Sequence, residues 1–217
     1  MKECVNNLYM INGSLFIILG VICYLIVRGI LIGIKNKKHV IWWKEIISFL
    51  FLVYICMVVA VTLFPLPIRF PSNIENLNRS VNIIPFASII KDINQIGSAY
   101  DGDALFMIGL IVRNVGGNIL LLMPLGFLAP ILWDKYKKFK NTILLGFSIS
   151  TSIELLQLIQ SLFSGVGRIT DIDDVICNVI GCILGYFIYK ITIMLAAKFN
   201  IQVFNETDSK RIETIDN

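Results

Sequence analysis

The sequence is poor in charge and lacks the patterns of a disulfide, zinc or repeat protein. Only 16% of its 217 residues are charged, and 56% are hydrophobic, whereas a soluble domain carries about 25% charged residues. The five cysteines are scattered, which excludes a disulfide framework and a zinc spacing. No internal repeat is present, so an inverted-repeat transporter gains no support. With a mean hydropathy of +0.77, the composition indicates an integral membrane protein.

The apolar residues are concentrated in long runs. Each has 20 or more residues, enough to cross a hydrocarbon core of roughly 30 Å: 12–34, 46–66, 109–133, 142–163 and 173–197. The first run is too long for a cleavable signal and has no basic flank before it. We therefore predict an all-α, polytopic membrane bundle of five transmembrane helices. The chain then divides into two N-terminal transmembrane helices (1–66), a connection (67–108), a three-helix core (109–197) and a disordered cytoplasmic tail (198–217).

The distribution of lysine and arginine predicts the orientation. Twelve of these residues fall in 35–44, in 134–141 and toward the C-terminus, and six are spread over the opposite side. We expect the N-terminus outside the cell and the C-terminus in the cytoplasm. Arg28, inside the first run, is expected to extend its side chain toward the cytoplasmic surface. The only histidine, His39, falls in a cytoplasmic loop, which removes histidine as an acid–base group at the outer side.

The long outer connection contains one helical pattern. Pro85 is suited to open a helix. Residues 82–96 place five apolar residues on one face, with the polar ones elsewhere: Phe86, Ile89, Ile90, Ile93 and Ile96. This predicts a short amphipathic helix on the outer surface. A shallow re-entrant hairpin is the alternative, which lipid tolerates only where other helices cover it.

Polar residues recur within the last three runs, in the outer half of the membrane. At about 1.5 Å per residue, Asn118 lies roughly 13 Å from the outer end of its run, and Glu154 about 18 Å from the inner end of its own. Gly116 and Gly117 are expected to allow close helix approach there. The polar site that we predict contains Arg113, Asn114, Asn118, Glu154, Gln157, Arg168, Asp171, Asp173, Asp174 and Asn178.

The stretch 167–186 organises this site. If this stretch is a helix, one face holds residues that step by 3, 4, 3 and 4: Asp171, Asp174, Asn178, Gly181 and Gly185. That face is polar at its outer end and has only glycine below, which suits close helix packing in lipid. Two alternatives remain open. The amides can form a closed network that only locks helix register, and Asp171 with Asp173 can be a solvated helix start that suits the helix dipole.

At these residues the sequence resembles the VanZ-like family of small membrane proteins. The matching pieces are NIIPF (82–86), NVGGNILLLMPLGFLAP (114–130), SISTSIELLQ (148–157) and GRITDIDDVICNVIGCILGY (167–186). The resemblance implies a polytopic protein of the bacterial cell membrane. The family's namesake contributes to resistance against teicoplanin, a lipid-bearing glycopeptide, without remodelling the cell-wall precursor.

Three functions compete for the polar site. The first is a binding module that holds a membrane lipid, a lipid-linked cell-wall precursor or the lipoglycopeptide itself, and so reduces drug binding at the cell surface. The second is a membrane enzyme acting on a lipid or envelope-precursor headgroup, with a divalent ion on the aspartates. The third is a proton-coupled carrier, disfavoured because the inner halves of the third and fifth runs lack polar groups. We expect no resident cofactor and no nucleic-acid partner, and the sequence leaves the oligomeric state open.

Overall fold

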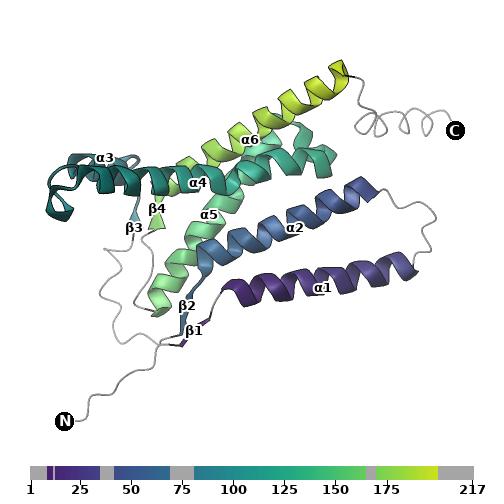
Figure 1. Cartoon of the computed structure of the whole chain (residues 1–217), viewed down its shortest axis with the longest axis horizontal. Helices are drawn as coiled ribbons and strands as arrows, with labels where there is room; N and C mark the ends of the chain where they lie inside the picture. The colour runs from purple at the N-terminus through teal and green to yellow at the C-terminus, as the bar shows by residue number, and fades with distance from the viewer. Residues whose placement is uncertain (1–8, 12, 35–41, 69–80, 165–169, 200–217) are drawn as a thin grey trace, which may run out of the picture.

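Five long helices dominate the computed structural model (Figure 1), which describes residues 9–11, 13–34, 42–68, 81–164 and 170–199. Each is long and apolar enough to cross a membrane, which confirms the predicted all-α membrane bundle. The helices are α1 (Gly13–Ile34), α2 (Trp42–Leu63), α3 (Ala87–Asn94), α4 (Ala104–Leu132), α5 (Phe139–Ser164) and α6 (Ile172–Lys198). Two 3-10 turns, η2 (Tyr100–Gly102) and η3 (Asp134–Lys137), flank α4.

Two short strand pairs join distant parts of the chain. Strand β1 (Tyr9–Ile11) pairs antiparallel with β2 (Leu66–Ile68), so the residues before α1 and after α2 lie together. Strand β3 (Val81–Asn82) pairs parallel with β4 (Thr170–Asp171), with Asn82 opposite Asp171. The second pair brings the segment before α3 to the start of α6.

The tightest packing joins α4 to α6. A Cβ atom on Gly181 would lie 1.8 Å from the carbonyl oxygen of Ile119, and one on Gly185 would lie 1.9 Å from that of Met123. Only glycine permits two helix backbones to approach so closely in lipid. The predicted close-packing role of Gly181 and Gly185 is therefore confirmed. Beside them, Leu122, Leu125 and Cys182 form a buried core cluster.

The glycine of α4 that permits close approach to α6 is not one of the two predicted. Nothing lies within 4 Å of a Cβ built on Gly116 or Gly117, so these residues do not provide the expected close approach. Gly126 provides it instead, because its Cβ would lie 1.9 Å from the carbonyl oxygen of Cys182.

The boundaries of α3 and α4 also differ from the predicted ones. Helix α4 begins at Ala104 rather than 109 because Asp103 caps it, accepting a hydrogen bond of 3.0 Å from the backbone N–H of Phe106. Helix α3 covers 87–94 rather than 82–96, since Val81 and Asn82 belong to β3. Phe86 has a φ of +63°, a left-handed conformation that excludes a continuous helix from Pro85.

Arg28 has a partner that the sequence analysis did not identify. Its Nε atom donates to Oε2 of Glu45 at 2.6 Å, and its Nη2 atom donates to Oε1. This bidentate pair ties α1 to the first turn of α2, and the extension of Arg28 toward the cytoplasmic surface stays a prediction. Helix α1 packs on α2 at the edge of the bundle, apart from α4 and α6 (Figure 1).

Candidate functional site

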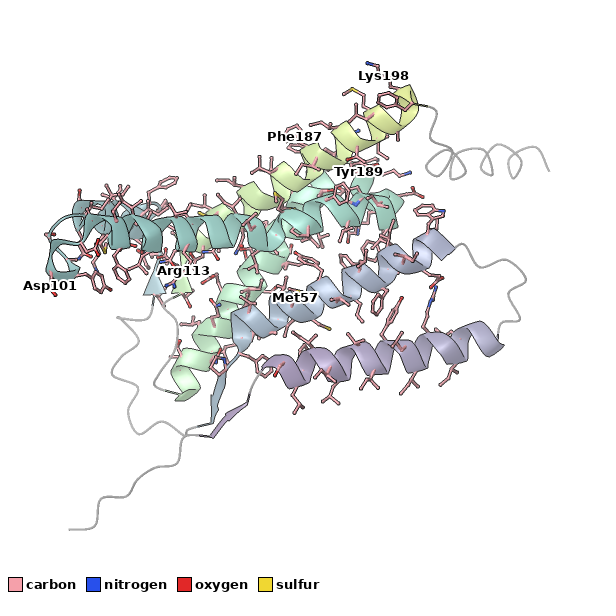
Figure 2. The ribbon with its side chains drawn as sticks, viewed as in Figure 1. Met57, Asp101, Arg113, Phe187, Tyr189 and Lys198 are labelled. Atoms are coloured by element: carbon pink, nitrogen blue, oxygen red, sulfur yellow. The ribbon has the colours of Figure 1, made fainter. Side chains whose placement is uncertain are left out.

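A cavity of about 770 Å³ lies among α2, α3, α4, α5 and α6. It is at the end of the molecule where α6 begins, and Figure 2 labels Arg113 toward that end and Lys198 at the opposite one. Nine of the ten residues predicted for the polar site line it: Arg113, Asn114, Asn118, Glu154, Gln157, Asp171, Asp173, Asp174 and Asn178. The tenth, Arg168, lies outside the described residues. Their role in binding a ligand stays a prediction.

Asp173 caps α3 from another helix. The first residue of α3 follows Phe86, which makes no side-chain capping bond of its own. The carboxylate of Asp173 replaces that cap, because it accepts the backbone N–H groups of Phe86 and, at 3.4 Å, of Ile89. A negative charge at a helix N-terminus is favoured by the free N–H groups and by the helix dipole.

Asp171 makes a second connection to the same segment. One carboxylate oxygen accepts from Asn82 Nδ2 at 3.1 Å and from the backbone N–H of Asp173 at 3.0 Å, and the other accepts from Ser88 Oγ. We call these hydrogen bonds of Asp171 and Asp173 to residues 82–89 the α3 latch. Both aspartates are buried, with 9% and 3% of their surface exposed. This burial contradicts a solvated helix start, whereas the predicted place at the start of a helix is confirmed, because Asp171 caps α6 and Asp173 lies in its first turn.

Glu154 lies against the start of α6 and does not face lipid. Only 5% of its surface is exposed. Its Oε2 atom accepts the backbone N–H of Asp171 at 3.1 Å, and its backbone carbonyl accepts from Thr170 Oγ1 at 3.3 Å. A buried carboxylate in a membrane span requires such donors. Glu154 thus positions β4 and, through it, the α3 latch.

Four polar side chains line the more exposed part of the cavity. Asn118 Nδ2 donates to Asp174 Oδ1 at 2.5 Å, which joins α4 to α6. Arg113 and Asn114 lie closer to the start of α4 and are exposed. At about 1.5 Å per residue, Arg113 is roughly 7.5 Å along the helix from Asn118. This part of the cavity therefore offers a cation and a carboxylate within reach of one small headgroup.

The deep end of the cavity is an amide floor. Asn178, with 1% of its surface exposed, donates from Nδ2 to Ser150 Oγ at 3.0 Å. Its other amide atom, assigned as Oδ1, has no hydrogen-bond partner among the residues that the structure describes. Gln157 donates to the backbone carbonyl of Thr62 at 3.0 Å and so joins α5 to α2. Part of the polar set therefore serves as the interhelical network that the sequence left as an alternative.

A model of one protein family, described as VanZ/LLP1, matches residues 51–195, about two thirds of the chain. The chain belongs to the VanZ/LLP1 family. The match begins within α2 and ends within α6, so it contains every described residue of the cavity wall and excludes α1. No curated protein and no solved structure matches the chain.

Several cavity residues of this VanZ/LLP1 protein were missed by sequence reasoning. Helix α2 contributes Val61 and Thr62, and α3 contributes Ser88, Ile89, Lys91 and Asp92. The α2 residues gave no signal because both lie inside the apolar run 46–66. Of the α3 residues, Ile89 belongs to the apolar face of the predicted helix, and Lys91 and Asp92 lie off that face. A single sequence does not show which partner either side of a helix meets.

Acidic residues outnumber basic residues in the cavity wall. Among the described residues, Lys91 and Arg113 are the cations, and five carboxylates accompany them: Asp92, Glu154, Asp171, Asp173 and Asp174. The α3 latch uses two of these carboxylates as acceptors. Within the described parts of the chain, no group of three or more histidine, cysteine or acidic residues is arranged to hold a metal ion. The aspartate metal site considered from the sequence is thus without support in these segments.

Proposed function

We propose that this VanZ/LLP1 protein binds the polar headgroup of a membrane lipid or lipid-linked cell-wall precursor at the outer face of the cell membrane. By holding that headgroup, it reduces the binding of lipoglycopeptides such as teicoplanin at the cell surface. The observation that carries the proposal is the single cavity into which α4, α5 and α6 direct their polar side chains.

The charge distribution supports the outward orientation. Seven lysines lie at the start of α2, around η3 and toward the end of α6: Lys44, Lys135, Lys137, Lys138, Lys140, Lys190 and Lys198. These segments are at the end of the bundle away from α3 and the cavity (Figure 1). Since basic residues favour the cytoplasmic side, the cavity is expected to face outward.

The packing below the cavity favours binding over transport. Leu122 and Leu125 are 1% exposed and Cys182 is fully buried, directly beyond the polar residues of α4 and α6. The glycine contacts of Gly181 and Gly185 close the space between the two backbones at the same level. A carrier requires a polar path through this region, and the described residues supply none there.

The chemistry of the wall suits a phosphate-bearing headgroup. Arg113 presents a guanidinium near the exposed end, and guanidinium groups bind phosphate oxygens in a bidentate manner. Asp174 and Asn118 lie deeper and accept or donate hydrogen bonds to hydroxyl or ammonium groups. A volume of about 770 Å³ is within the range of about 300–1,000 Å³ that ligand pockets occupy.

The test expresses the protein in teicoplanin-susceptible bacteria and measures both drug binding to cells and membrane abundance. Glu154→Gln, Asp174→Asn and Arg168→Ala are compared with Asp134→Asn, an exposed acid at the other end of the bundle. We expect the first three to restore drug binding to the level of cells without the protein, at unchanged abundance. The control should retain the effect.

Two results would overturn the proposal. One is equal teicoplanin binding by cells with and without the wild-type protein. The other is a loss of effect that always follows loss of abundance, which assigns the polar residues to a structural network.

Comparing the envelope lipids of the same strains addresses the enzyme hypothesis, because only a reaction on a headgroup changes their composition.

A further inference from the structure

A second hollow, of about 260 Å³, lies at the opposite end of the bundle from the polar cavity. Helix α2 supplies Phe51, α4 supplies Leu125, α5 supplies Leu145 and Ile149, and Trp133 with η3 completes the wall. We call it the aromatic slot, lined by Phe51, Leu125, Trp133, Lys135, Tyr136, Leu145 and Ile149. Lys135 is its one charged wall residue among the described parts of the chain.

Aromatic rings hold the slot open. Trp133 meets Phe51 edge to face at a centroid distance of 5.1 Å and Tyr136 at 6.0 Å. Such edge-to-face pairs stabilise defined ring positions. Trp133 keeps 45% of its surface exposed, so its ring is accessible at the mouth of the slot. Tryptophan and tyrosine are typical of the boundary between acyl chains and headgroups.

The size and polarity of the slot indicate which kind of ligand it can bind. At about 260 Å³, it is below the range of about 300–1,000 Å³ for sites that enclose a whole small ligand. Its wall is apolar except at Lys135. An apolar chain thus fits inside, while any polar group attached to that chain remains at the mouth.

Lys135 places a positive charge in the wall of the slot, and further lysines follow it in the chain. Lys135 is exposed, with its Nζ atom 5.8 Å from the centroid of the Tyr136 ring. Lys137, by contrast, forms an ion pair of 2.8 Å with Asp134. Lys138 and Lys140 follow in the chain and are also exposed. Basic pockets beside membrane helices attract anionic headgroups, with about 1 kcal/mol for each lysine near the surface.

We propose that the aromatic slot binds one acyl chain of an anionic phospholipid whose phosphate contacts Lys135. The charge complementarity at the mouth and the apolar interior together distinguish this occupant from a neutral lipid. The site is separate from the polar cavity, so it stands or falls independently of the proposed function.

Fluorescence of Trp133 in lipid vesicles tests the proposal. Trp42→Phe together with Trp43→Phe leaves Trp133 as the only tryptophan of the chain. This protein is reconstituted in phosphatidylcholine vesicles containing brominated phosphatidylglycerol or, at equal mole fraction, brominated phosphatidylcholine. We expect brominated phosphatidylglycerol to quench Trp133 with a roughly fivefold higher apparent affinity.

Variants of two lysines separate the slot from general surface charge. Lys135→Gln should abolish the preference for the anionic lipid, and Lys135→Arg should retain it. Lys140→Gln removes one positive charge from a residue outside the slot wall and should lower the preference less than Lys135→Gln does. Equal quenching by the two brominated lipids, or equal losses in Lys135→Gln and Lys140→Gln, would overturn the proposal.

Discussion

Helices α4 and α6 meet in two regions of opposite character. From Ile119 onward, Gly126, Gly181 and Gly185 bring the two backbones into direct contact. One residue earlier, Asn118 binds Asp174 across the wall of a large cavity. Glycine occurs in both regions, yet Gly117 lines the cavity with nothing within 4 Å of its missing Cβ. A small residue in a membrane helix therefore marks either a contact or a space, and only the neighbouring helix decides which.

The largest expected effect is the loss of the α4–α6 contact in Gly181→Ala. The added Cβ would lie 1.8 Å from the carbonyl oxygen of Ile119, a backbone atom that cannot move aside without separating the helices. We expect a destabilisation of roughly 3 kcal/mol, at the upper end for overpacked sites, and low membrane abundance. Unfolding of the purified protein by heat or by SDS in mixed micelles measures the change.

Gly117→Ala is the matched control for that experiment. Its Cβ meets no atom within 4 Å, and alanine in a helix interior is favoured over glycine by about 1 kcal/mol. We expect unchanged or slightly higher stability. Equal destabilisation by the two alanine variants would contradict the contrast between a packed and an open region.

Filling the cavity should abolish function while the fold remains. In Gly117→Phe the aromatic ring enters the cavity of about 770 Å³, where it competes with a bound headgroup. Stability should stay within about 0.5 kcal/mol of the wild type, and teicoplanin binding should return to the level of cells without the protein. Full protection by this variant at normal abundance would mean that the cavity is not the functional site.

Release of α3 should be a smaller, local effect. Asp173→Ala removes the carboxylate that accepts the N–H groups of Phe86 and Ile89. Losing a helix cap lowers the stability of the helix by about 1–2 kcal/mol. A loss of about 1.4 kcal/mol corresponds to roughly tenfold faster amide exchange in that helix. Hydrogen–deuterium exchange at 87–94 should increase, while exchange at 119–126 stays unchanged.

Asp92→Ala provides the comparison for that measurement. It removes an acid from α3 itself without removing the cap, so exchange at 87–94 should stay near the wild-type rate. If Asp173→Ala accelerated exchange equally in α3 and along the α4–α6 contact, Asp173 would stabilise the whole bundle rather than the α3 latch.

The sequence was sufficient for the helices and for the gathering of polar groups. Run length determines the spans, and the rise per residue places Asn118 and Glu154 at similar depth whatever their partners are. The α3 latch was beyond this reasoning because Ser88 and Asp171 are 83 residues apart. Periodicity shows that each lies on a polar face, but not that the two faces meet.

The exchanged roles of the glycines in α4 have a similar cause. Gly116, Gly117 and Gly126 all occur in the same helix, and spacing alone does not reveal which of them faces α6.

The partner of Arg28, in contrast, left a signal in the sequence. Glu45 comes directly before the apolar run 46–66, although α2 begins at Trp42. A charged residue at that boundary is tolerated because the opposite charge on α1 neutralises it.

The smallest expected effect concerns this pair of Arg28 and Glu45, at the edge of the bundle. The two side chains are 37% and 24% exposed, and such pairs contribute about 1 kcal/mol or less. A double-mutant cycle of Arg28→Gln and Glu45→Gln should give a coupling energy in that range. Because α1 lies outside the matched family region 51–195, teicoplanin binding should be unaffected. A coupling above about 2 kcal/mol, or a loss of protection in either variant, would instead connect α1 to the cavity.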